Sequence, residues 1–173
     1  MKTILLLRHA KSAWNTPGLA DHERPLNRRG ERAAKAMADH LAGQGPRPDQ
    51  ILCSTAIRAR QTLAPLVSLW TPAPLISLEE GLYLASEDQL MARLRALADN
   101  VGTVLLIGHN DGIGQFAEML AGRGSAALMT ALRDKYPTGT LTTLRAPIRQ
   151  WPELAAGAAE LAGFVRPRDL MGG

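Results

Sequence analysis

Short apolar runs alternate with longer amphipathic segments along the first two thirds of the chain. The runs cover residues 3–8, 50–53, 75–78 and 103–107 and have the composition of strands buried on both faces. Between them, apolar residues recur at helical spacing over 28–41, 56–70, 86–97 and 113–120. Ser86 and Gln89 have the spacing of a capping box, which marks the start of the third helix. Strand and helix therefore alternate four times.

This alternation predicts an α/β fold, namely a three-layer α/β/α sandwich with a mostly parallel central sheet. Two later strands are expected over 140–145 and 160–166, separated by a turn that contains Trp151 and Pro152. We expect one domain over residues 1–173, because this length suits one hydrophobic core and the chain shows no repeat or low-complexity segment.

Composition excludes several other classes of protein. Hydrophobic residues make up 46% and charged residues 21%, which is typical of a folded globular chain and not of a disordered one. Prolines interrupt the longest uncharged stretch, 61–78, and the apolar run at the amino terminus is too short for a signal peptide, so we expect a cytoplasmic protein without a membrane span. A single cysteine, Cys53, excludes an internal disulfide and a cysteine-based zinc cluster.

Positive charge is concentrated in the first third of the chain. Residues 1–60 contain 11 Lys and Arg against 5 Asp and Glu, whereas the whole chain has a net charge of only +4. An anionic substrate, a nucleic-acid surface or a solvated basic helix would each explain this skew. Aromatic residues make up only 4% of the chain, which disfavours a surface that stacks on single-stranded nucleic acid. We therefore expect no nucleic-acid partner.

Reactive side chains follow all four predicted strands. Arg8 and His9 come directly after the first strand, Arg58 follows the second, a Glu79–Glu80 pair follows the third, and His109 follows the fourth. The carboxyl ends of parallel strands meet at one edge of a sheet, so these groups are expected to converge in one crevice.

Together these groups suit the transfer of a phosphoryl group. A neutral imidazole can attack phosphorus, guanidinium groups and a second histidine can bind phosphate oxygens, and a carboxylic acid can protonate the leaving group. No metal ion or other cofactor is required. The segment from Cys53 to Arg58 is not a cysteine-phosphatase loop, since four residues separate the two side chains where five are needed. Asp21, His22 and Glu23 have side chains that can bind a metal ion, but adjacent residues point apart and no second cluster of such residues exists. We therefore interpret this segment as a charged surface loop.

Four motifs in this order resemble those of the histidine phosphatase (phosphoglycerate mutase-like) superfamily. They are Leu-Arg-His-Ala-Lys-Ser at 7–12, Ser-Thr-Ala-Ile-Arg-Ala-Arg-Gln-Thr at 54–62, Glu-Gly-Leu-Tyr at 80–83 and Gly-His-Asn at 108–110. Two positions depart from the usual pattern: Ala10 replaces a glycine, and Asp111 replaces a proline that often follows the last motif. We expect Asp111 to cap the following helix.

The resemblance implies a role for each matching residue. His9 would be the nucleophile that becomes phosphorylated, and Arg8, Arg58 and His109 would form the phosphate pocket. Glu80 would be the proton donor, chosen over Glu79 because its spacing to Tyr83 fits the motif better. Three further residues match positions on the substrate side of such pockets: Ser12, Asn15 and Asn110.

Spacing indicates the kind of substrate. Glu80 lies 22 positions after Arg58, and His109 lies 29 positions after Glu80, which leaves no room for a large lid. An open site suits a phosphorylated protein side chain, as in the short SixA-type phosphohistidine phosphatases, which the segment 151–167 also resembles. The expected function is therefore metal-independent dephosphorylation of phosphohistidine on a signalling protein of the histidine phosphotransfer type. Two alternatives stay open: a phosphomonoesterase acting on a small phosphoester, and a phosphate-recognition module without catalysis.

Overall fold

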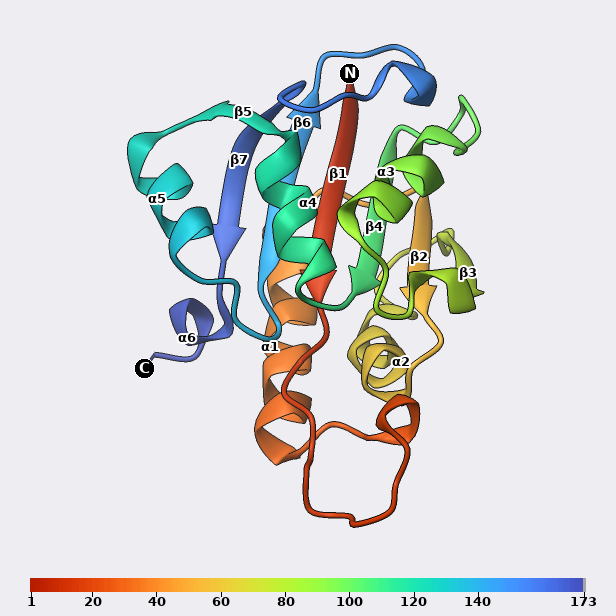
Figure 1. Ribbon diagram of the computed structural model, residues 1–173, viewed down its shortest axis with the longest axis vertical. Helices are drawn as coiled ribbons and strands as arrows, with labels where there is room; N and C mark the ends of the chain where they lie inside the picture. Colours follow the sequence, from red (N-terminus) through yellow and green to blue (C-terminus); the bar gives the residue numbers. More distant parts are fainter. Residues whose placement is uncertain (173) are drawn as a thin grey trace.

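The computed structural model describes residues 1–172 and arranges them around one seven-stranded sheet (Figure 1). The strands are β1 (Lys2–Arg8), β2 (Gln50–Ser54), β3 (Leu75–Glu79), β4 (Thr103–Gly108), β5 (Ala121–Gly124), β6 (Leu141–Ala146) and β7 (Ala159–Val165). The α-helices are α1 (Arg28–Gln44), α2 (Ile57–Leu63), α3 (Glu87–Arg95), α4 (Gly112–Leu120), α5 (Ala126–Asp134) and α6 (Pro167–Leu170). None of these helices is long and apolar enough to cross a membrane.

The sheet is mostly parallel, as the sequence predicts. Its strand order is β3-β2-β4-β1-β6-β7-β5. The four strands that alternate with helices, β1 to β4, pair in parallel, and β6 is antiparallel to both of its neighbours. Consequently the first four strands end at the same edge of the sheet, and β1 and β4 lie side by side at its centre (Figure 1).

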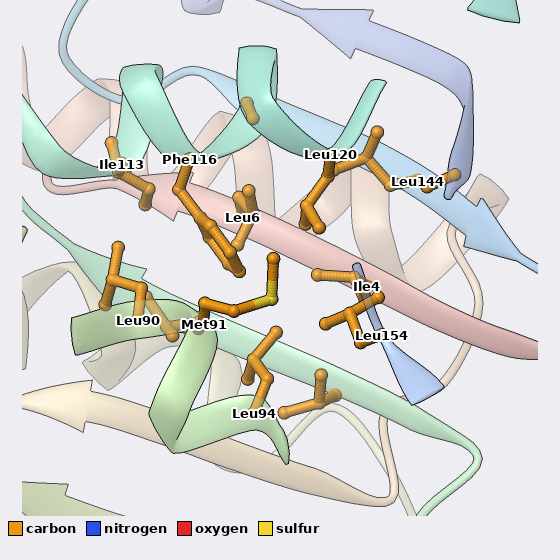
Figure 2. Packing of buried hydrophobic residues seen from close by; sticks show 14 of the residues in the cluster. Ile4, Leu6, Leu90, Met91, Leu94, Ile113, Phe116, Leu120, Leu144 and Leu154 are labelled. Atoms are coloured by element: carbon orange, nitrogen blue, oxygen red, sulfur yellow. The ribbon is translucent and has the colours of Figure 1, made fainter. Parts of the chain in front are cut away.

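Helices cover both faces of the sheet, which confirms the three-layer sandwich. Side chains alternate along β1, so that Ile4 and Leu6 join a core with α3, α4 and α5, while Leu5 and Leu7 join a second core with α1 and α2. Figure 2 shows the first core, where Phe116 of α4 and Met91 of α3 pack over Leu6. The predicted capping box of α3 is present, with both hydrogen bonds formed between Ser86 and Gln89.

The structure differs from the sequence prediction in three places. The helix expected over 56–70 ends at Leu63 and continues only as a 3₁₀ turn to Leu66, since Pro65 cannot donate a backbone hydrogen bond. The expected turn around Trp151 is also a 3₁₀ turn, and the Trp151 indole is fully buried and donates to the carbonyl of Val101. Strand β5 and helices α5 and α6 were not expected.

Candidate active site at the carboxyl edge of the sheet

A cavity of about 220 Å³ opens at the edge where β1, β2 and β4 end. Its lining residues are Arg8, His9, Lys11, Ser12, Trp14, Arg24, Arg58, Leu84, His109, Asn110 and Thr138. The register of the sheet explains the convergence: Arg8 on β1 lies beside Gly108 on β4, so His9 and His109 leave neighbouring strands at the same level. Their ring centroids are 5.2 Å apart.

His9 is held as a neutral imidazole whose Nε2 is unprotonated. Its Nδ1 lies 2.7 Å from the carbonyl oxygen of Ala10, which can only accept, so Nδ1 carries the proton. The other nitrogen, Nε2, accepts from Arg58 Nε at 3.3 Å. Burial, reinforced by the positive charges of Arg58, Arg8 and Arg24, lowers the pKa of His9 to about 4. The Nε2 lone pair of this side chain is therefore available at neutral pH.

Arg58 is buried and fixed by Asp21, which comes from the loop after β1. Its two terminal nitrogens donate to the Asp21 carbonyl at 2.6 Å and to Asp21 Oδ2 at 2.9 Å. A hydrogen bond from the Tyr83 hydroxyl, with further ones from Arg58 and Arg24, holds the pKa of the Asp21 carboxyl well below its usual range. Asp21 is thus an ionised group that orients the guanidinium, and it is a poor proton donor.

His109 is held by a serine at the end of β2. The nearest Arg58 nitrogen, 3.4 Å from His109 Nδ1, can only donate, so Nδ1 accepts and Nε2 donates to Ser54 Oγ at 2.7 Å. Burial, with His9 and Arg58 nearby, lowers the pKa of His109 to about 3. An anion in the cavity would favour the protonated ring, which could then donate to it.

Arg8 and the turn before β6 complete the floor of the site. One terminal nitrogen of Arg8 donates to the Tyr136 carbonyl at 2.6 Å, whereas its buried Nε has no hydrogen-bond partner among residues 1–172. The amide of Gly139 donates to the carbonyls of both Arg8 and His9, and its φ of +75° is a conformation that favours glycine. An unpaired buried donor on a cation is a feature expected of an anion site.

The spacing of the second motif has a structural cause. Arg58 and Thr62 lie four residues apart on α2, so Thr62 Oγ1 can donate to the Arg58 carbonyl at 2.7 Å. The same oxygen accepts from the amide of Ala10 at 3.0 Å. Thr62 therefore ties α2 to the loop that carries His9, and this tie fixes Arg58 relative to the nucleophile.

The structure brings most of the expected residues together but not all of them. Ser12 lines the cavity and accepts from Arg24 at 2.6 Å. Asn15 and Glu80 are exposed and lie outside the lining of the cavity. Glu79 is occupied elsewhere, in a bidentate ion pair with Arg93.

The two departures from the family pattern are accommodated without crowding the cavity. The methyl group of Ala10 is buried in a small cluster with Leu26 and residues of α1, away from the cavity lining. The expectation that Asp111 caps α4 is wrong: its exposed side chain makes no capping hydrogen bond, and Asn110 Oδ1 accepts from the amide of Gly114 instead. Asn110 lines the cavity, but this oxygen is engaged in the helix.

Several site residues were not identified from the sequence. Asp21 and Arg24 come from the loop between β1 and α1, in which residues 21–23 were interpreted as a charged surface, and Lys11 and Trp14 line the cavity from the same loop. The excess of positive charge in the first sixty residues was the one feature of the sequence that could have indicated further cationic side chains at the site. Cys53 is buried, and burial raises the pKa of its thiol to about 12, which makes it an unreactive core residue.

The composition of the cavity limits its chemistry. Its lining holds three arginines, a lysine and two neutral histidines, and no Asp or Glu among residues 1–172 belongs to it. No group of three or more His, Cys, Asp or Glu in this part of the chain is arranged to hold a metal ion. Such a cavity can bind a phosphoryl group and present one nucleophilic nitrogen to it, but its lining supplies no carboxylic acid as a proton donor.

Comparisons with known proteins agree with this geometry. The sequence profile of the histidine phosphatase superfamily (branch 1) matches residues 4–82. Among curated proteins, an uncharacterized protein of Mycobacterium tuberculosis is 38% identical over 164 residues, which cover 94% of this chain and 100% of the relative. A second uncharacterized protein, from Mycobacterium leprae, is 34% identical over 166 residues, with 94% and 100% coverage.

Solved structures give the same result. The proposed phosphohistidine phosphatase SixA of Nakamurella multipartitia has a TM-score of 0.82 and 31% identity, and the similarity covers 96% of each chain. The corresponding protein of Agrobacterium tumefaciens has a TM-score of 0.81 and 32% identity over 96% of this chain and 98% of that one. A protein histidine phosphatase SixA complexed with tungstate, at 21% identity and a TM-score of 0.76, shares the fold.

Proposed function

The chain belongs to the histidine phosphatase superfamily, in its SixA-type branch, and from this premise we propose that it is a phosphatase that removes the phosphoryl group from phosphohistidine on a protein. The phosphoryl group occupies the cavity beside His9. Arg8, Arg58 and His109 bind its oxygens, and Ser12, which accepts from Arg24, supports the rim of the pocket.

In the first step His9 takes the phosphoryl group. Its Nε2 lone pair attacks phosphorus, a new P–N bond forms, and the P–N bond to the substrate imidazole breaks. The hydrogen bond from Nδ1 to the Ala10 carbonyl keeps the ring in the reactive tautomer throughout. Arg58 neutralises charge on the phosphoryl oxygens while Asp21 holds its terminal nitrogens, and its Nε releases the hydrogen bond to His9 Nε2 so that this lone pair can attack.

The observation that carries the choice of substrate is the absence of any carboxyl group from the described lining of the cavity. When the P–O bond of an aliphatic phosphate ester breaks, the alcohol leaves as an alkoxide unless an acid protonates its oxygen. Phosphohistidine has a second, basic ring nitrogen that can carry a proton. When the P–N bond breaks, the imidazole of the substrate therefore leaves as a neutral group. A site rich in arginine and poor in acids therefore suits a P–N bond better than a P–O bond to an alcohol.

In the second step water attacks phosphorus of phospho-His9. The P–N bond to Nε2 breaks, inorganic phosphate leaves, and the neutral imidazole of His9 is regenerated. Water loses its proton as it attacks, and the departing phosphate can carry that proton away. No role in either step falls to Glu80, which is exposed and outside the cavity lining.

The rim of the cavity fits a large substrate. Trp14 and Leu84 line it and are 78% and 56% exposed, so two large apolar side chains beside the cavity are available for contact with a partner. Between Tyr83 and the start of β4 the chain forms only the short helix α3, so no lid covers the cavity from this side. The phosphorylated side chain of a folded protein can reach His9 while its surroundings rest on this rim.

The test compares release of phosphate from a phosphohistidine-bearing carrier protein with release from a panel of small phosphomonoesters. We expect selective hydrolysis of the protein and a phosphoryl group on His9 after rapid quenching, detected by mass spectrometry at alkaline pH. The His9→Ala variant should lose both the hydrolysis and the phosphorylated enzyme, while its circular dichroism spectrum stays unchanged. Glu80→Gln should retain activity on the protein substrate within about threefold, because Glu80 lies outside the cavity lining and an imidazole leaving group needs no proton from it.

Two results would contradict the proposal in different ways. Turnover of one small phosphoester, with none of the protein, would make the chain a metabolite phosphatase. Wild-type turnover by His9→Ala would remove the assigned nucleophile.

A further inference from the structure

A second cavity, of about 350 Å³, lies next to the candidate active site. Four of its lining residues are arginines: Arg29 and Arg32 from α1, Arg166 after β7, and Arg168 in α6. Thr138 lines both this cavity and the one beside His9, so the two cavities adjoin at that residue. We call the four arginines and the space between them the arginine pocket.

Most of the positive charge in the arginine pocket is uncompensated. Only Arg166 has an ion pair, with both carboxylate oxygens of Asp169. The other three side chains are exposed, and no carboxylate among the described residues lies within salt-bridge distance of them. Arg29 and Arg32 also stand three residues apart on one face of α1, and Arg29 is in its first turn, where the helix dipole disfavours a cation. This arrangement concentrates positive charge at one place on the surface, which favours binding of an anion.

We propose that the arginine pocket binds acidic side chains of the protein substrate that lie near its phosphorylated histidine. This inference rests on the proposed function and adds the charge of the partner to it. The pocket would hold carboxylates while the phosphoryl group enters the cavity beside His9, with Thr138 between the two contacts.

The exposure of the arginines favours an acidic protein surface over a second phosphoryl group. The phosphate cavity uses buried donors fixed by other groups, as Arg58 is by Asp21. The arginine pocket instead has exposed side chains at its mouth, which suit several carboxylates spread over a surface. Nucleic acid is a poorer occupant because no aromatic side chain lines this pocket within residues 1–172.

The experiment compares two phosphohistidine peptides that differ only in having glutamates or glutamines beside the phosphorylated residue. Wild-type enzyme should prefer the glutamate peptide in kcat/KM by roughly tenfold, and the preference should fall with added salt. The triple variant Arg29→Gln, Arg32→Gln, Arg168→Gln should lose the preference while its hydrolysis of p-nitrophenyl phosphate stays unchanged. The control triple variant, Arg123→Gln, Arg145→Gln, Arg149→Gln, removes the same charge from exposed arginines at the opposite edge of the sheet. This variant should keep the preference for the glutamate peptide.

Equal rates on the two peptides, or an undiminished preference in the pocket variant, would overturn the inference. If neither phosphohistidine peptide is hydrolysed, the proposed function fails, and the pocket is then tested by binding of a fluorescent, unphosphorylated glutamate peptide. Weaker binding by the pocket triple than by the control triple supports the pocket. Equal binding by both triple variants counts against the pocket. So does displacement of the peptide by pyrophosphate, or by an oligonucleotide of equal charge, at a lower concentration than the unlabelled glutamate peptide needs.

Discussion

The direction in which Arg58 points depends on a single carboxylate outside the cavity lining. Asp21 receives Arg58 on Oδ2 and Arg24 on Oδ1, so it holds two guanidiniums that line the cavity in fixed positions. Arg58 is almost fully buried, whereas Asp21 is half exposed. Loss of the carboxylate would therefore leave a buried cation without its partner.

We accordingly expect Asp21→Asn to lower kcat/KM roughly ten- to hundredfold, because small displacements of a positioning group cost rates of this order. The main effect should be on kcat, since Arg58 also faces Nε2 of the nucleophile. Steady-state kinetics with a phosphohistidine peptide measures this, and Asp39→Asn, which removes an exposed carboxylate paired with Lys35, is the control. Equal kinetics in the two variants would show that Asp21 does not position Arg58.

Among single residues of the site, the sequence could predict those placed by strand ends but not Asp21 and Arg24, which are placed by a loop. His9, Arg58 and His109 were predictable because each closely follows a strand whose end is fixed by sheet geometry. Asp21 and Arg24 reach the site through a loop between β1 and α1 that has no regular pattern. Glu80 illustrates the converse: a motif match placed it after β3, yet β3 is the edge strand, and its end is separated from β1 by β2 and β4.

Among the elements, α1 is positioned by one close contact with the catalytic loop. A Cβ atom on Gly30 would lie 2.0 Å from the Lys11 carbonyl oxygen, so only glycine lets the helix approach this backbone. The amide of Asn27 donates to the same carbonyl. The first turn of α1 therefore sets the position of the chain between His9 and Ser12, as well as that of Arg29.

The prediction is that Gly30→Ala destabilises the protein by about 1–3 kcal/mol, the usual range for overpacking, and reduces phosphatase activity. Gly43→Ala in the same helix is the matched control, since nothing lies within 4 Å of a Cβ atom there. Alanine at that position should be neutral or stabilising by up to about 1 kcal/mol. Urea denaturation of both variants measures the difference, and a Gly30 variant as stable as the Gly43 variant would refute the close contact.

The predictability of an element followed the strength of its local pattern. Strands β1 and β4 each contain a continuous run of four apolar residues and were predicted within a residue of their bounds. Strand β5 has the sequence Ala-Gly-Arg-Gly, which has neither alternation nor β-branched residues, and it forms because it can pair with the edge of β7. Its existence is a tertiary effect that no local window contains.

For the molecule as a whole, the site makes the fold sensitive to mild acid. An unfolded histidine binds a proton near pH 6.5, but the folded protein lowers the pKa of His9 to about 4 and that of His109 to about 3. Between pH 6.5 and pH 4 the unfolded state therefore binds more protons, so the stability present above pH 6.5 is lost as the pH falls. Carboxylates contribute little to this loss above pH 5, because their usual pKa values lie lower.

We expect the free energy of unfolding to fall between pH 7.5 and pH 5 by about 2 kcal/mol for each of the two histidines. His109→Gln keeps a side chain that can donate to Ser54 but cannot bind the proton, so its stability should fall by about half as much over the same range. Urea titrations of both proteins at a series of pH values measure the slopes. If the slopes of the wild type and the variant are the same, His109 is not held neutral by burial. The unprotonated site assumed for attack by His9 would then need another cause.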